Sequence, residues 1–136
     1  MDFMKSLFVA ASGLKAQSGR MRVIAENIAN ADSTARTPAG DPYRRKIPTF
    51  ETVFDTKMRA NMVELGRIEK DRTDFNLRFN PSHPAANADG FVKMPNVDRL
   101  VEAVDMREAQ RSYEANLNVI TSTRTMLART LEILRA

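Results

Sequence analysis

The sequence NIANADSTARTPAGDPYRRK, residues 27–46, separates two parts of the chain that have different residue patterns. Before it, apolar residues recur every three or four positions, as in an amphipathic helix; after it, apolar and polar residues alternate, as in strands. The segment combines two asparagines, a Ser/Thr-rich run, three Pro or Gly residues and three consecutive basic residues. Three roles fit such a segment: an active-site loop, a nucleic-acid contact, or a joint in a larger assembly. Its candidate functional residues are Asn27, Asn30, Pro42, Tyr43, Arg44 and Arg45.

The first 30 residues carry a heptad pattern, with apolar or small residues at alternating steps of three and four. This pattern predicts a helix over residues 1–30. Gly13 and Gly19 each weaken an isolated helix by roughly 1 kcal/mol relative to alanine, so we expect this helix to need a partner. The stripe consists of Met4, Leu7, Ala11, Leu14, Ser18, Met21, Ala25 and Ile28.

The last 41 residues predict a second and longer helix, over 96–136. Asn96 follows Pro95 and is a good N-cap, and no proline or glycine occurs from there to the end. A second apolar stripe, Val119, Met126 and Ile133, runs beside the first in the last part of this helix. The first stripe consists of Met106, Gln110, Tyr113, Leu117, Ile120, Arg124, Leu127, Leu131 and Leu134.

The middle of the chain, residues 31–95, predicts an extended joint followed by a small β segment. Residues 61–71 and 73–80 alternate in strand fashion, with a change of phase at Gly66 that suggests a β-bulge, and the short link between them suggests a hairpin. Pro48 restricts residues 43–54 to an edge strand at most. We therefore expect a mainly α protein with a small β insertion, in which the two terminal helices pack as a coiled-coil-like pair.

Several classes of function have no support in the residues. The chain has no cysteine and a single histidine, His83, so thiolate and histidine-cluster metal sites are not expected. No nucleotide-binding or hydrolase motif is present, turn chemistry explains Asp71 and Asp74, and we expect neither an enzyme nor a cofactor. Residues 1–50 hold eight Lys and Arg against four Asp and Glu. One alternative is therefore a secreted helical adaptor whose basic N-terminal region binds a membrane surface or nucleic acid.

Two helices of this length cannot bury both stripes of the second helix within one chain. A helix of about 38 residues is about 57 Å long, and the β segment is too small to cover what remains. Exposed apolar stripes of this size indicate protein partners. The residues expected at the assembly interface are Leu7, Leu14, Met21, Ile28, Tyr113, Leu117, Ile120, Leu127, Leu131 and Leu134.

Four stretches together resemble the flagellar rod and hook axial proteins, and most closely the proximal-rod members of the FlgC type. The resemblance covers about two thirds of the chain in the right order, and it is weakest over residues 53–79. The stretches are NIANADST (27–34), TPAGDPYRRK (37–46), HPAANADGFVKMPNVD (83–98) and EAQRSYEANLNVITSTRTM (108–126).

The resemblance implies a structural subunit of the basal-body rod, a helical tube that transmits torque across the periplasm. It implies an inner wall built from the helices at 1–30 and 96–136, with 31–95 lying outside. Implied partners are copies of itself, other rod proteins, the ring-to-rod adaptor, the MS ring and, in transit, the flagellar type III export apparatus, without a cleaved signal peptide. Neither nucleic acid nor a small-molecule substrate is implied. Residues 27–46 would then be the joint, where Asn27 and Asn30 either cap the helix or bond a neighbouring subunit.

Overall fold

A computed structural model describes residues 2–135, which form two compact units. We call the first the helix–hairpin unit; it comprises the residues up to Met21, Pro48–Arg67, and the residues from Arg107 onward. We call the second the joint unit; it comprises Arg22–Ile47 and Ile68–Met106.

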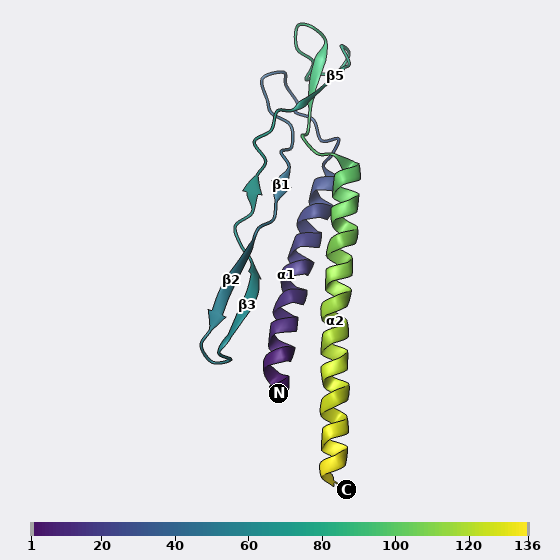
Figure 1. Ribbon diagram of the computed structural model, residues 1–136. Helices are drawn as coiled ribbons and strands as arrows, with labels where there is room; N and C mark the ends of the chain where they lie inside the picture. The colour runs from purple at the N-terminus through teal and green to yellow at the C-terminus, as the bar shows by residue number, and fades with distance from the viewer. Residues whose placement is uncertain (1, 136) are drawn as a thin grey trace. The chain divides into compact units, whose positions relative to one another are not determined.

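The two predicted helices are present. Helix α1 is Phe3–Ala29 and helix α2 is Arg99–Arg135 (Figure 1). The predicted N-cap of α2 was wrong: the side chain of Asp98, not that of Asn96, accepts hydrogen bonds from the backbone N–H groups of Leu100 and Val101. A carboxylate at this position also interacts favourably with the positive end of the helix dipole. No helix in residues 2–135 is long and apolar enough to cross a membrane.

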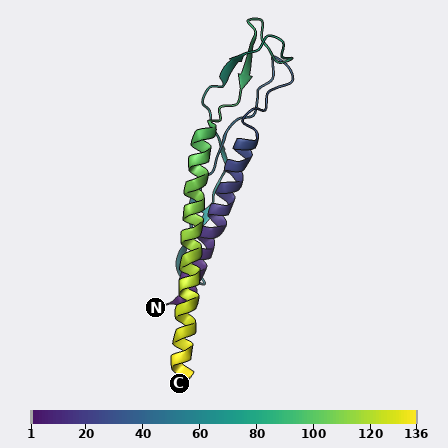
Figure 2. The same ribbon diagram turned by 90° about the vertical axis from the view of Figure 1, so that its right-hand side faces the viewer.

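In the helix–hairpin unit, the two helix segments run antiparallel and side by side (Figures 1 and 2). They approach closely at Gly13, where a Cβ atom would lie 2.8 Å from the side chain of Asn116. Arg20 and Glu108 form an ion pair at 3.7 Å. Because Gly13 lies opposite Asn116 and Arg20 opposite Glu108, the start of α1 lies opposite a residue near 126. The last turns of α2 therefore extend beyond α1.

A β-hairpin completes this unit. Strand β2 (Phe50–Asp55) pairs antiparallel with β3 (Ala60–Leu65), with Phe50 opposite Leu65. The hairpin lies against α1: the N–H of Val63 donates to the hydroxyl of Ser12, and a Cβ atom at Gly19 would lie 2.8 Å from Leu65. Both helix-weakening glycines thus lie where α1 meets a neighbouring element.

The joint unit contains two further ladders. Strand β1 (Lys46–Ile47) pairs antiparallel with β4 (Glu69–Lys70), and β5 (Asn76–Phe79) with β6 (Phe91–Met94). A small apolar core lies under the β5–β6 ribbon. Its buried residues are Ala85, Val92 and Met94, against which Ala35 and Ala86 pack.

The predicted strand pairing was wrong. Residues 61–71 do not pair with 73–80; β3 pairs backward with β2, and β5 pairs forward with β6. The turn at 55–60 is stabilised by the Asp55 carboxylate, which accepts from the N–H groups of Lys57 and Met58. The phase change at Gly66 marks the end of β3 and no bulge, because Gly66 donates to the carbonyl of Thr49 after the ladder ends.

Candidate functional site

The end of α1 is held by one fully buried amide, that of Asn27. Its Nδ2 donates to the Lys46 carbonyl at 2.8 Å and to Oε2 of Glu102 at 3.1 Å. Its Oδ1 accepts from the Tyr43 hydroxyl at 2.8 Å and from the Lys46 N–H at 2.9 Å. The Asn27 side chain thus connects the end of α1 to Tyr43 and Lys46 and to Glu102 at the start of α2.

Glu102 is the second fully buried polar group. It accepts a charge-assisted hydrogen bond from Nε of Arg45, whose guanidinium also lies 3.5 Å from the Asp71 carboxylate and 3.7 Å from that of Asp105. Partial burial lowers the pKa of Arg45, but the hydrogen bond and the negative charges of Glu102 and Asp71 outweigh it and raise the pKa overall. We call Asn27, Tyr43, Arg45, Lys46 and Glu102 the joint network.

Tyr43 belongs to the network as a neutral donor. Burial raises the pKa of its phenol to about 12, and the nearby charges of Glu26 and Glu102 add to that effect. The phenol therefore keeps its proton at neutral pH and donates it to Asn27. Glu26 also forms an ion pair with Lys46.

A second set of contacts fixes the chain after β4. The side chain of Asn96 accepts from the Arg45 N–H at 2.8 Å and donates to the carbonyls of Asp71 and Thr73. Nη1 of Arg44 donates to the same two carbonyls, at 2.8 and 2.9 Å. The pKa of the Asp71 carboxyl lies below its ordinary value, chiefly because it accepts from the Thr73 N–H and, after a smaller opposing effect of burial, because of the Arg45 charge.

Of the predicted joint residues, Asn27, Tyr43, Arg44 and Arg45 converge in these contacts, and Pro42 is buried beside them. Asn30 has a different role: its Nδ2 donates to the Glu26 carbonyl at 2.9 Å, so it caps the C-terminus of α1 locally. The basic triplet at 44–46 is not a free patch of charge: Arg45 pairs with Glu102, Asp71 and Asp105, and Lys46 pairs with Glu26.

The sequence reading missed Glu102 and the role of Asn96. Glu102 is a charged residue on the side of α2 that later carries Ala109, seven residues on, and Thr123, fourteen residues further, and both of those are buried. A carboxylate within such a heptad is the signal that could have revealed it. His83 serves its own turn, since its Nδ1 accepts from the N–H of Ala85 at 3.0 Å. No group of His, Asp or Glu in residues 2–135 is placed to hold a metal ion.

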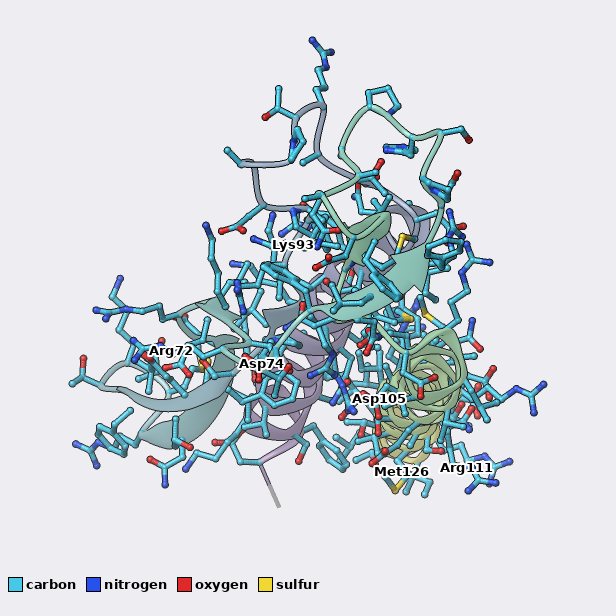
Figure 3. All side chains as sticks on the ribbon, turned by 90° about the horizontal axis from the view of Figure 1, so that it is seen from above. Arg72, Asp74, Lys93, Asp105, Arg111 and Met126 are labelled. Carbon is cyan, nitrogen blue, oxygen red and sulfur yellow. The ribbon has the colours of Figure 1, made fainter. Side chains whose placement is uncertain are left out.

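Several large apolar residues of α2 remain exposed, among them Leu117, Val119 and Met126. One side of α2 in the helix–hairpin unit carries small or polar residues: Ala109 and Thr123 are buried, and Asn116 lies against Gly13 of α1. Figure 3 shows Met126 on the outside of α2 and Arg111 projecting away from α1. Among the predicted assembly residues, Leu7, Leu14, Met21, Ile28, Tyr113, Ile120 and Leu127 are half-buried, whereas Leu117, Leu131 and Leu134 are exposed.

Two family models match parts of the chain. Residues 7–36 match the family described as "Flagella basal body rod protein", and residues 88–133 match "Flagellar basal body rod FlgEFG protein C-terminal". These two matches cover the joint asparagines and most of α2.

Three relatives are each named flagellar basal-body rod protein FlgC. That of Agrobacterium fabrum is 50% identical over 128 residues, which cover 94% of this chain and 92% of the relative. That of Bacillus subtilis is 41% identical, with 98% and 99% covered. That of Salmonella typhimurium is 38% identical, with 92% of each chain covered. They give no support to a membrane-binding or nucleic-acid-binding adaptor. The chain belongs to the FlgC family of flagellar basal-body rod proteins, and it is a structural subunit of the rod and not an enzyme.

Proposed function

We propose that this subunit joins the rod through the outer side of α2, in a helical tube that crosses the periplasm and transmits torque. In this proposal α1 and α2 form the inner wall as a coiled-coil-like pair, and residues 31–95 lie outside. The partners are copies of the chain, other rod proteins, the ring-to-rod adaptor and the MS ring. The chain reaches them through the type III export apparatus, without a cleaved signal peptide.

One observation carries the proposal: α2 meets α1 at the polar residue Asn116 and leaves several large apolar residues exposed, most of all in its last turns. Leu131 is 53% exposed and Leu134 is 77% exposed, both beyond the start of α1. Burying one leucine contributes roughly 1.5–3 kcal/mol, so a surface of several such residues supplies a large driving force for association. A contact between different surfaces of identical or similar subunits, if it does not close into a ring, produces a helical filament.

The test replaces Leu117, Leu131 and Leu134 together with serine and measures recovery in purified basal bodies by immunoblot. We expect the variant to be exported to the periplasm and to be missing from basal bodies. A matched control replaces three exposed polar residues of the same helix, Glu114, Arg129 and Glu132, with serine, and should assemble. Recovery of the leucine variant at the level of the control would refute this surface as the rod contact.

A further inference from the structure

The joint unit contains a cavity of about 420 Å³ beside the joint network, which contributes Tyr43 and Lys46 to its walls. Its size lies within the range of small-ligand and peptide side-chain sites. Its apolar walls are Pro42, Tyr43 and Phe75, and its charged walls are Arg44, Lys46, Lys70 and Asp41. Cations and aromatic surfaces together suit an anionic group with an apolar neighbour.

Two of these cations have no neutralising partner within the described chain. Lys46 pairs with Glu26, and Asp41 is occupied by Lys93, which stands on the β5–β6 ribbon (Figure 3). Among residues 2–135, neither Arg44 nor Lys70 forms an ion pair with a carboxylate. The cavity therefore carries a net positive charge.

The ladder places two of the cations opposite each other. Lys46 and Lys70 are direct cross-strand partners in the β1–β4 pair, and both line the cavity. Like charges directly opposite each other destabilise a two-stranded ladder. An anion bound between or beside them would turn this repulsion into attraction.

The guanidinium of Arg44 is fixed in position and has donors left to bind such an anion. It lies 4.2 Å from the centre of the Phe75 ring, and Nη1 is held by two backbone carbonyls. Within residues 2–135, Nε and Nη2 have no hydrogen-bond partner. A guanidinium fixed on one side, with donors left over on the other, is suited to a carboxylate.

We propose that this cavity binds a carboxylate side chain from an acidic peptide segment of a neighbouring rod subunit. The assignment of the source to a rod subunit rests on the proposed function, whereas carboxylate binding itself does not. The apolar walls favour a peptide over a free inorganic anion, because they would cover the methylene groups of a glutamate side chain.

The experiment titrates the full-length, isotopically labelled protein with the peptide acetyl-Glu-Glu-Glu-Gly-amide and follows the backbone amides of residues 41–46 and 68–75 by NMR. Parallel titrations use the matching glutamine peptide and inorganic phosphate at equal ionic strength. We expect saturable shifts with the glutamate peptide and much smaller ones with the other two probes. Equal shifts with phosphate would overturn the peptide assignment, and no shifts with any probe would overturn the site.

The Lys70→Gln variant separates binding from folding. It should weaken peptide binding about tenfold or more, since it removes a charge-assisted contact. It should leave the denaturation midpoint unchanged or higher, because it removes a like-charge neighbour. Lys57→Gln, at an exposed lysine in the turn between β2 and β3, is the control and should bind as the unaltered protein does. Equal weakening in both variants would show only general charge attraction and would overturn the site.

Recovery of Lys70→Gln in basal bodies tests the source of the carboxylate. We expect reduced recovery relative to Lys57→Gln. Peptide binding together with normal recovery of Lys70→Gln would overturn the neighbouring-subunit source, whatever the outcome for the leucines of α2.

Discussion

The joint network and the last turns of α2 differ in how their side chains are satisfied. In the network, fully buried polar groups meet partners from the same chain: Asn27 makes four hydrogen bonds and Glu102 pairs with Arg45. In the last turns of α2, large apolar side chains such as Ile133 and Leu134 remain more than three-quarters exposed. The polar groups of the first region find their partners within one subunit, whereas the second region leaves apolar surface uncovered. In our proposal, this difference separates residues that fold the subunit from residues that join it to the rod.

The largest effect on folding should come from Asn27→Ala. The substitution leaves the Lys46 N–H and carbonyl, the Tyr43 hydroxyl and one Glu102 oxygen without their partner, and buried unpaired groups cost about 1–3 kcal/mol each. We expect a loss of about 3 kcal/mol in the free energy of opening of the joint unit, measured by hydrogen exchange of its backbone amides. The control is Asn30→Ala, which should cost about 1 kcal/mol. Equal losses in the two variants would contradict the special role of Asn27.

A smaller effect is expected for Tyr43→Phe, about 1 kcal/mol at neutral pH for one hydrogen bond. The pKa of Tyr43 is raised from 10.0 to about 12, so the folded state holds the phenolic proton more tightly than the unfolded state. Its contribution is complete below pH 10 and is lost as the pH rises to about 12. Denaturant titrations between pH 9 and 12 should show this loss in the unaltered protein. If Tyr43→Phe lost stability just as steeply between pH 9 and 12, Tyr43 would be excluded as the cause.

Asp71 should make a contribution to stability that is lost as the pH falls, whereas that of Tyr43 is lost as the pH rises. The pKa of Asp71 is lowered from the model-compound value of 3.8, so its contribution is present above about pH 3.8 and is lost as the pH falls below that value. Asp71→Asn should therefore reduce the loss of stability in acid, measured by hydrogen exchange between about pH 2 and 4. The control is Asp74→Asn, at an exposed carboxylate three residues away (Figure 3), and an equal effect in both variants would contradict the role of Asp71.

The smallest effect on the free protein is expected at the end of α2. Replacing Leu131 and Leu134 with serine should change the stability of the isolated subunit by at most about 0.5 kcal/mol per site, because both side chains are already exposed. Thermal unfolding followed by circular dichroism would measure it. A loss comparable with that of Asn27→Ala would show that these leucines pack within the subunit, and the contrast between the two regions would fail.

The helices could be predicted from the sequence because a period of three and four residues over many turns has no competing explanation. The expected ranges 1–30 and 96–136 differ from α1 and α2 by one to three residues at the ends that the structure describes. The strand pairing could not be predicted. Alternation in residues 73–80 identifies β5 as a strand but does not select its partner, which lies beyond the loop at Asn80–Gly90.

The site was predictable only in part, for a related reason. Asn27, Tyr43 and Arg45 occur close together in a segment of unusual composition, whereas Glu102 lies in a helix already rich in charged residues. Its complete burial depends on which side of α2 meets α1. The apolar stripe suggested that the side with Leu117 meets α1. Leu117 is exposed, however, and Asn116 lies against α1, where the two helices approach closely at Gly13.

The bond between Asn27 and Glu102 joins positions 75 residues apart, and the pair of Arg45 with Glu102 spans 57. Contacts between distant positions form only after the chain between them has lost much of its freedom, so they form slowly compared with local ones. A growing or partly threaded chain that ends before residue 102 contains Asn27, Tyr43 and Arg45 without the carboxylate that completes their bonds. The hydrogen bonds of the joint network can therefore be completed only when the start of α2 is present. Folding of the joint, in the first third of the chain, depends on a residue in the last third.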